Sequence, residues 1–188
     1  MSTANAIVVA LLALLTVLGL VGGGIYNRLV RARVRTREAW SGIDVQLKRR
    51  ASLIPNLVET VRGYASHERD TLDAVARARG SLDQAASPGD AATANDELSR
   101  TLGRLFAVVE AYPELRASEN FSRLHQDLAD VEEKIAYARQ FYNRNVADFN
   151  ARIQTLPDVL VARAMGLERF EFFELGDETA TEVSVDFG

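Results

Sequence analysis

The sequence contains no cysteine, and only 4 of its 188 residues are proline. The absence of cysteine excludes disulfides, thiolate nucleophiles, iron–sulfur clusters, Cys-ligated zinc and a lipid-modified N-terminal cysteine. Only two histidines are present, His67 and His125, and neither follows a glutamate three residues earlier. The paired Glu-x-x-His motifs of di-metal helical bundles are therefore missing. We predict that the protein binds no metal ion and no cofactor.

The polar residues also lack the arrangement that a hydrolase needs. A nucleophile, a base and an orienting group have to converge on one pocket, but serine and histidine are scattered over segments of helical periodicity. No nucleophile elbow, GK[ST] or GxGxxG motif is present. We predict that the protein is not an enzyme. A deep polar pocket around either histidine would revive the alternative of a hydrolase or a metalloprotein.

Charge is distributed unevenly along the chain. Residues 1–27 carry no charged side chain, residues 28–50 carry eight basic and two acidic ones, and residues 168–188 carry seven acidic and one basic. The net charge of −4 gives no general attraction to nucleic acid, so we predict no nucleic-acid partner. The acidic tail is either a disordered solubilising extension or a contact for the basic segment of a neighbouring molecule.

An uncharged apolar stretch runs from Ala6 to Ile25. As a helix it is about 30 Å long, which is the thickness of the hydrocarbon layer of a bilayer. We therefore predict that residues 1–27 form a transmembrane anchor; a cleaved signal peptide and a soluble core helix are the alternatives. Gly22, Gly23 and Gly24 indicate a pivot or a close helix approach, or are simply tolerated in a bilayer.

Five arginines follow the apolar stretch within ten positions, and no basic residue precedes it. Basic residues beside a span are retained on the cytoplasmic side. The sequence thus predicts a single-pass membrane protein with its N-terminus outside and residues 28–188 in the cytoplasm. These arginines, called the basic neck below, also predict contact with anionic lipid headgroups, at about 1 kcal/mol each. A purely topogenic role is the alternative. The basic neck consists of Arg28, Arg31, Arg33, Arg35 and Arg37.

The rest of the chain has helical periodicity. Apolar residues recur at alternating spacings of three and four from Phe121 to Phe149 and again from Leu98 to Tyr112, and no segment of similar length alternates with period two. We predict an all-α protein in which residues 28–157 form an antiparallel, up-and-down four-helix bundle, with helices near 28–51, 52–85, 91–112 and 115–156. At Pro55 we predict the first turn of a new helix capped by Ser52, and a kink in one long helix is the alternative.

A third segment, residues 158–188, follows the bundle. A short helix is predicted over 158–165, and the aromatic residues after it are predicted to pack back onto the bundle. These residues are Phe170, Phe172 and Phe173.

Several stretches of this sequence resemble the LemA family of bacterial membrane-anchored helical proteins. The resemblance covers residues 26–157 with the spacing intact, and it leaves the tail from Gly176 outside. It implies a protein of the bacterial inner membrane with an N-terminal anchor and an up-and-down bundle, and it implies no established reaction, ligand or catalytic residue. The stretches are Tyr26-Asn27-x-Leu29-Val30, residues 38–50 (EAWSGIDVQLKRR), residues 53–61 (LIPNLVETV), Tyr64-x-x-His67-Glu68, residues 76–79 (ARAR), residues 112–121 (YPELRASENF) and residues 135–143 (IAYARQFYN).

Two functional hypotheses follow. The first is a non-enzymatic, membrane-anchored helical scaffold that forms a homo-oligomer or binds a membrane-protein partner. The second is an anionic-lipid-responsive remodelling or sensing protein that uses the basic neck. The candidate protein contacts, each with an intramolecular core role as its alternative, are Trp40, Ile43, Leu47, Phe170, Phe172 and Phe173.

Overall fold

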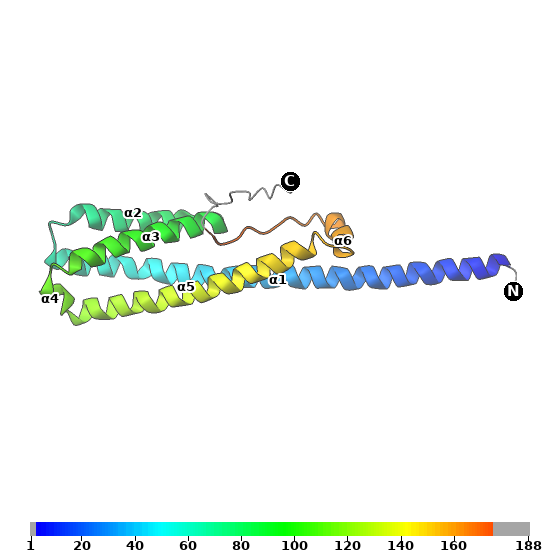
Figure 1. The fold of residues 1–188 in the computed structure, drawn as a ribbon, viewed down its shortest axis with the longest axis horizontal. Coiled ribbons are helices and arrows are strands. Elements are labelled where there is room, and N and C mark those ends of the chain that lie inside the picture. The colour runs from blue at the N-terminus through cyan, green and yellow to red at the C-terminus, as the bar shows by residue number, and fades with distance from the viewer. Residues whose placement is uncertain (1–2, 175–188) are drawn as a thin grey trace, which may run out of the picture. The chain divides into compact units, whose positions relative to one another are not determined.

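The computed structural model describes residues 3–174, and this part of the chain is helical without any strand (Figure 1). The all-α prediction is confirmed for these residues, including the short helix predicted near 158–165. The predictions for the acidic tail fall on residues 175–188, outside the described part. The helices are α1 (Thr3–Tyr64), α2 (Arg69–Gln84), α3 (Pro88–Val109), α4 (Pro113–Arg116), α5 (Glu119–Arg152) and α6 (Asp158–Ala164).

Helix α1 continues through Pro55, so the predicted break between residues 51 and 52 is wrong. The Ser52 hydroxyl does not cap a new helix; it donates a hydrogen bond to the Arg49 carbonyl at 2.7 Å. Ile54 and Leu57, on either side of the proline, are buried. Burial of this apolar seam offsets the hydrogen bond that proline removes. The helix ends at Tyr64, before the turn that contains His67.

The chain divides into two compact units, which we describe separately. Unit 1 comprises the described residues of Met1–Ala39 together with Asn143–Phe170, and unit 2 comprises Trp40–Tyr142 together with the chain from Glu171. Helices α1 and α5 each contribute to both units. The predicted segment boundaries at residues 27 and 157 remain predictions.

Unit 1 is organised around one apolar cluster. The cluster joins α1, the end of α5 and α6, and Phe170 packs against it. The Thr36 hydroxyl of α1 donates to the Asn145 carbonyl of α5 at 3.4 Å. The buried members are Ile25, Leu29, Phe149, Ile153 and Ala162.

In unit 2, two polar contacts join α1 to α5 and show the relative direction of these helices. Arg50 pairs with Glu132 at 2.8 Å, and Asn120 donates to the Thr60 hydroxyl at 3.0 Å. Since the α1 residue number rises while the α5 number falls, the two helices are antiparallel here. Helix α2 packs along α3, and Ser87 caps α3 by accepting from the backbone N–H of Asp90 at 3.1 Å.

The predicted seam of α5 is buried from Phe121 to Ile135 and again at Tyr142 and Phe149. One predicted position differs, because Asn145 is only half-buried and the neighbouring Val146 is buried instead. A straight α-helix has 3.6 residues per turn, so an apolar repeat of 3.5 drifts around the helix over a long segment. The seam was thus predictable along most of the helix, but the choice between Asn145 and Val146 was not.

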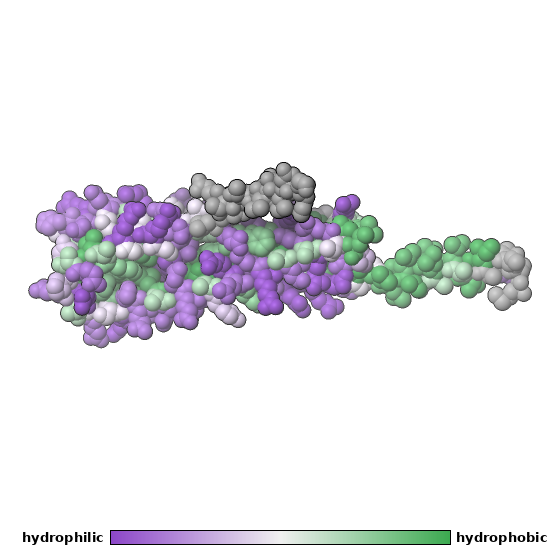
Figure 2. Space-filling model, in the orientation of Figure 1, coloured by the Kyte–Doolittle hydropathy of each residue, from purple (hydrophilic) through white to green (hydrophobic). Residues whose placement is uncertain are grey.

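The apolar stretch of α1 lies outside the packed part of the molecule. It is long and apolar enough to cross a membrane, and apart from Ile25, which belongs to the cluster of unit 1, its described side chains are not buried. Its visible side is uniformly hydrophobic (Figure 2). A signal sequence near an N-terminus has the same length and composition. A Cβ atom added at Gly22, Gly23 or Gly24 meets nothing within 4 Å, so no close approach to these glycines occurs among the described residues.

Candidate functional site

The basic neck divides between two faces of α1 within unit 1. Arg28, Arg31 and Arg35 are spaced by three and four residues, which places them on one face, whereas Arg33 and Arg37 lie on the opposite face. All five side chains are exposed. The sequence predicted one continuous basic neck, but the helix presents two separate sets of arginines.

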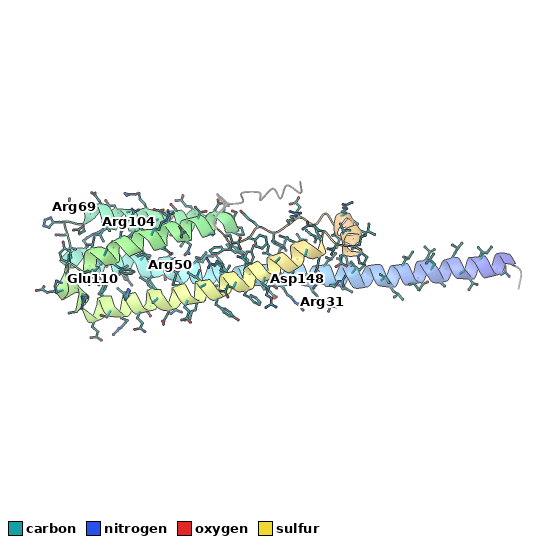
Figure 3. All side chains as sticks on the ribbon, in the orientation of Figure 1. Arg31, Arg50, Arg69, Arg104, Glu110 and Asp148 are labelled. Atoms are coloured by element: carbon teal, nitrogen blue, oxygen red, sulfur yellow. The ribbon has the colours of Figure 1, made fainter. Side chains whose placement is uncertain are left out.

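The first set lines a groove between α1 and the end of α5. The groove has a volume of about 280 Å³, and Gly24, at the end of the apolar stretch, forms part of its wall. Figure 3 labels Arg31 on α1 and Asp148 on α5, one from each side of the groove. The complete lining is Gly24, Arg28, Arg31, Ala32, Arg35, Asp148 and Arg152.

Two of the four groove arginines are engaged in ion pairs. Arg28 pairs with Asp158, whose side chain is only 5% exposed at the start of α6. Arg152 donates through Nε to Asp148 at 2.9 Å. This hydrogen bond and the charge of Asp148 raise the pKa of Arg152, although partial burial opposes the shift. These pairs orient the two guanidinium groups but neutralise only part of the groove's charge.

The other two groove arginines, Arg31 and Arg35, make no ion pair with any residue among 3–174. They lie four positions apart, where two like charges repel each other across one helical turn. With four arginines and one aspartate along its walls, the groove is strongly cationic. Such a site attracts anions, and planar guanidinium groups suit phosphate and carboxylate oxygens.

Exposed leucines lie at the same end of unit 1. Leu156, in the turn after α5, is 76% exposed, and Leu160, in α6, is 64% exposed. Helix α6 packs through Ala162 on the cluster that includes Ile25, the last residue of the apolar stretch. The groove and these leucines therefore both lie beside the end of the apolar stretch.

The predicted protein-contact residues of unit 2 are mostly buried. Ile43, Leu47 and Phe173 are at most 5% exposed. The ring of Trp40 lies 5.5 Å from that of Tyr142 and 6.1 Å from that of Phe173, measured between centroids. These residues form an internal contact, so the buried three are inaccessible to a partner while unit 2 is folded.

The remaining two aromatic residues differ in position. Phe170 packs in unit 1 against Phe149, with centroids 4.9 Å apart, and the amide of Asn150 exchanges two 2.9 Å hydrogen bonds with the Phe170 backbone. Phe172 is 37% exposed in unit 2. In unit 2 the Tyr142 hydroxyl donates to the Glu171 carbonyl at 2.7 Å. Sequence reasoning missed Asn150, because a single polar residue beside an apolar seam gives no pattern.

Arg50 is a second residue whose role the charge pattern concealed. It belongs to the basic stretch of residues 28–50, but it is only 4% exposed. It donates to Asn95 and, at 2.9 Å, to Ser99, and it pairs with Glu132. Burial lowers the pKa of Arg50, and the nearby Glu132 opposes the shift. Its spacing of three from Leu47 and four from Ile54 was the available signal, since it continues the apolar seam.

The two histidines lie in different surroundings. His67 is exposed in the turn after α1. His125 lies in an open groove of about 560 Å³, with its ring 4.8 Å from Phe106 and 6.1 Å from Phe121. Among the described residues His125 makes no hydrogen bond to a serine or a carboxylate, and no group of three or more His, Asp or Glu side chains is placed to hold a metal ion.

The chain is similar to several named bacterial proteins. Magnetosome protein MamQ of Magnetospirillum gryphiswaldense is 25% identical over 174 residues, covering 79% of this chain and 64% of that protein. Magnetosome protein MamQ 2 of Paramagnetospirillum magneticum is 25% identical over 175 residues with the same coverage. Protein LemA of Metamycoplasma hominis is 25% identical over 161 residues, covering 84% of this chain and 72% of that protein. The chain thus spans 64% of the length of the magnetosome relatives.

The profile of the LemA family matches residues 39–187. The match includes the tail from Gly176, which corrects the expectation that this tail lies outside the resemblance, and it begins after the basic neck. Since the match covers more than half of the sequence, the chain belongs to the LemA family.

Proposed function

We propose that the protein is a non-enzymatic scaffold, tethered to the bacterial inner membrane by residues 6–25, that self-associates or binds a partner protein. The observation that carries the proposal is the continuity of α1 from an exposed apolar stretch into the core of a folded unit. A cleaved signal peptide needs no such continuity. The magnetosome relatives and the family are consistent with a protein that works at a membrane.

For orientation and fold we keep the sequence-based proposal. The N-terminus lies outside, the packed part lies in the cytoplasm, and an antiparallel four-helix bundle is formed by α1, α2, α3 and α5. Within unit 2, the antiparallel contacts between α1 and α5 and the packing of α2 on α3 support this arrangement. The contact of Arg50 with Asn95 links α1 to α3 as well.

The surface that we propose for self-association lies on α1 and α5 in unit 2. A groove of about 450 Å³ is lined by Gln46 of α1 and by Glu133, Lys134 and Tyr137 of α5, among others. Tyr137 is 74% exposed. Neighbouring opposite charges on Glu133 and Lys134 let a second copy of α5, running antiparallel, pair each charge with its opposite, as a two-fold interface requires.

One further atom favours a contact at this groove. Gln46 Oε1 is buried and accepts no hydrogen bond from a described residue. A buried acceptor without a donor costs about 1 to 3 kcal/mol. A donor from a second copy, such as the Tyr137 hydroxyl, would remove this cost. We therefore favour a second copy over a different partner protein.

The tether is tested by alkaline carbonate extraction of membranes containing the full chain. We expect the mature protein to keep residues 6–25 and to stay in the membrane pellet. Recovery of a soluble chain without this stretch would overturn the proposal. Protease added to the outside of spheroplasts tests orientation, and digestion of the packed part would reverse it.

The scaffold is tested by placing a photo-crosslinking amino acid at Tyr137 in the full chain in membranes. The matched control is Arg104, an exposed residue on α3 of the same unit. We expect dimer-sized adducts from position 137 and few from position 104. Adducts to another protein would replace self-association by a partner, and a strict monomer without adducts would refute the scaffold.

A second candidate function, an anionic-lipid-responsive membrane remodelling or sensing protein, is favoured by one specific observation. This is the arginine-lined groove of unit 1 beside the end of the apolar stretch. Lipid-dependent clustering of the protein in vesicles would distinguish it from simple scaffolding.

A further inference from the structure

We infer that the arginine-lined groove of unit 1 is a defined binding site for the phosphate of an anionic phospholipid headgroup. This inference goes beyond a diffuse basic neck, because it assigns the role to Arg31 and Arg35 with Arg28 and Arg152, and excludes Arg33 and Arg37. It rests on the proposed tether through residues 6–25.

The groove lies at the end of the apolar stretch. Gly24 belongs both to the wall of the groove and to the last turn of the apolar stretch. When that stretch occupies the hydrocarbon layer, the groove opens at the depth of the lipid phosphates. Leu156 and Leu160, exposed at the same end of unit 1, suit the apolar side of this interface. The anions nearest to the groove are therefore the phosphates of the lipid headgroups.

The groove also carries a net positive charge. Asp148 and Asp158 hold Arg152 and Arg28 in place, and Arg31 and Arg35 have no ion-pair partner among residues 3–174. Two like charges one turn apart weaken a helix unless an anion lies between them. A phosphate accepts hydrogen bonds from both guanidinium groups and cancels their repulsion.

The groove is built from residues of two helices. Arg28, Arg31 and Arg35 come from α1, and Arg152 with Asp148 comes from α5. Asp148 restricts Arg152 through a hydrogen bond of 2.9 Å. A topogenic signal needs only the number of positive charges near a span. It does not need an arginine from α5, a helix that begins only at Glu119, nor a carboxylate that orients this arginine.

The experiment uses the full chain in a neutral detergent, mixed with equal amounts of phosphatidylglycerol and phosphatidylcholine that have identical acyl chains. Native mass spectrometry counts each lipid bound. We expect phosphatidylglycerol to be retained preferentially. Arg31→Gln and Arg35→Gln should each reduce this preference about fivefold, the equivalent of about 1 kcal/mol. Arg33→Gln, which removes the same charge at a similar depth on the opposite face, should leave the preference within about twofold.

A variant with an expected gain in lipid preference separates loss of the site from loss of the fold. Asp148→Asn removes the one carboxylate of the groove but leaves an amide oxygen that can still accept the hydrogen bond from Arg152. It should therefore raise the preference for phosphatidylglycerol, which no unfolded chain can do. Equal effects of Arg33→Gln and Arg31→Gln would overturn the site in favour of diffuse charge. Release of phosphatidylglycerol by excess inorganic phosphate at constant ionic strength would overturn the lipid assignment in favour of free phosphate.

Failure of this inference is distinguishable from failure of the tether. Native mass spectrometry measures headgroup preference and not membrane insertion. Equal counts of the two lipids would overturn the headgroup site alone, whereas loss of residues 6–25 from the membrane pellet would overturn the tether, and with it the headgroup site.

Discussion

Arginines on one helix serve differently in the two units. In unit 2, Arg50 of α1 is buried and contacts Asn95, Ser99 and Glu132. In unit 1, Arg31 and Arg35 of the same helix are exposed and have no ion-pair partner among residues 3–174. Figure 3 labels Arg50 and Arg31 on α1. The comparison teaches that the phase of a residue on the helix, and not the local charge density, separates a structural arginine from one available to a ligand.

The largest expected effect is on the structural side of this comparison. Arg50→Ala should lower the free energy of unfolding by about 2 to 4 kcal/mol, because it leaves Asn95, Ser99 and Glu132 without their partner. Thermal unfolding of the full chain in detergent, followed by circular dichroism, measures the loss. The neighbouring, exposed Arg49→Ala is the control and should be nearly neutral. Equal effects of the two substitutions would break the distinction.

A smaller effect is expected for a buried polar group of unit 1. Asn150→Ala removes both hydrogen bonds to the Phe170 backbone and should cost about 1 to 3 kcal/mol. Because the loss is local, hydrogen exchange at the Phe170 amide should accelerate before global unfolding. Gln140→Ala, an exposed polar position on the same helix, is the control. Unchanged exchange at Phe170 would show that Asn150 is not structural.

Tyr142 gives a pH-dependent test in unit 2. Burial, with a further contribution from the charge of Glu171, raises the pKa of Tyr142 to about 12. An unfolded tyrosine ionises near pH 10, so the stabilising effect is complete below about pH 10 and is lost as the pH rises from about 10 to about 12. Tyr142→Phe should lower stability by about 1 kcal/mol through loss of the bond to Glu171.

The phenolate absorbance provides the readout for this prediction. The component that titrates at about pH 12 should disappear in Tyr142→Phe and persist in Tyr137→Phe, which alters an exposed ring. Persistence of the high-pH component in Tyr142→Phe would assign it to another residue.

The smallest effect is expected for the available arginines. Arg31→Gln should change the free energy of unfolding by less than about 0.5 kcal/mol, because Arg31 is exposed and makes no ion pair with a described residue. The same unfolding measurement compares it with Arg50→Ala. A cost as large as that of Arg50→Ala would place Arg31 on the structural side.

Periodicity predicted much of the fold. It located the buried seams of α3 and α5 and the short α6, because a seam of many apolar residues outweighs any single exception. It failed at Pro55, where a strong local signal for a break was outweighed by the burial of Ile54 and Leu57 on both sides. Local propensity is a weak guide where tertiary burial opposes it.

The candidate site was predictable only in part. The sequence indicated that arginines follow the apolar stretch, and helical spacing already separates Arg31 and Arg35 from Arg33. The contribution of Arg152 and Asp148 was not predictable, because it depends on which residues of α5 lie opposite α1. Asp158, which pairs with Arg28, lies beyond a turn and gave no sequence signal.

The segment that follows α6 is held partly through its backbone, in addition to the side-chain packing of Phe170 and Phe173. Asn150 contacts the main-chain N–H and C=O of Phe170, and the Tyr142 hydroxyl contacts the carbonyl of Glu171. Every residue type except proline offers these same groups. The side chains that make these backbone contacts therefore belong to α5. The side chains of positions 171 and 172 can differ between relatives without loss of these contacts, so long as α5 keeps an amide and a phenol eight residues apart.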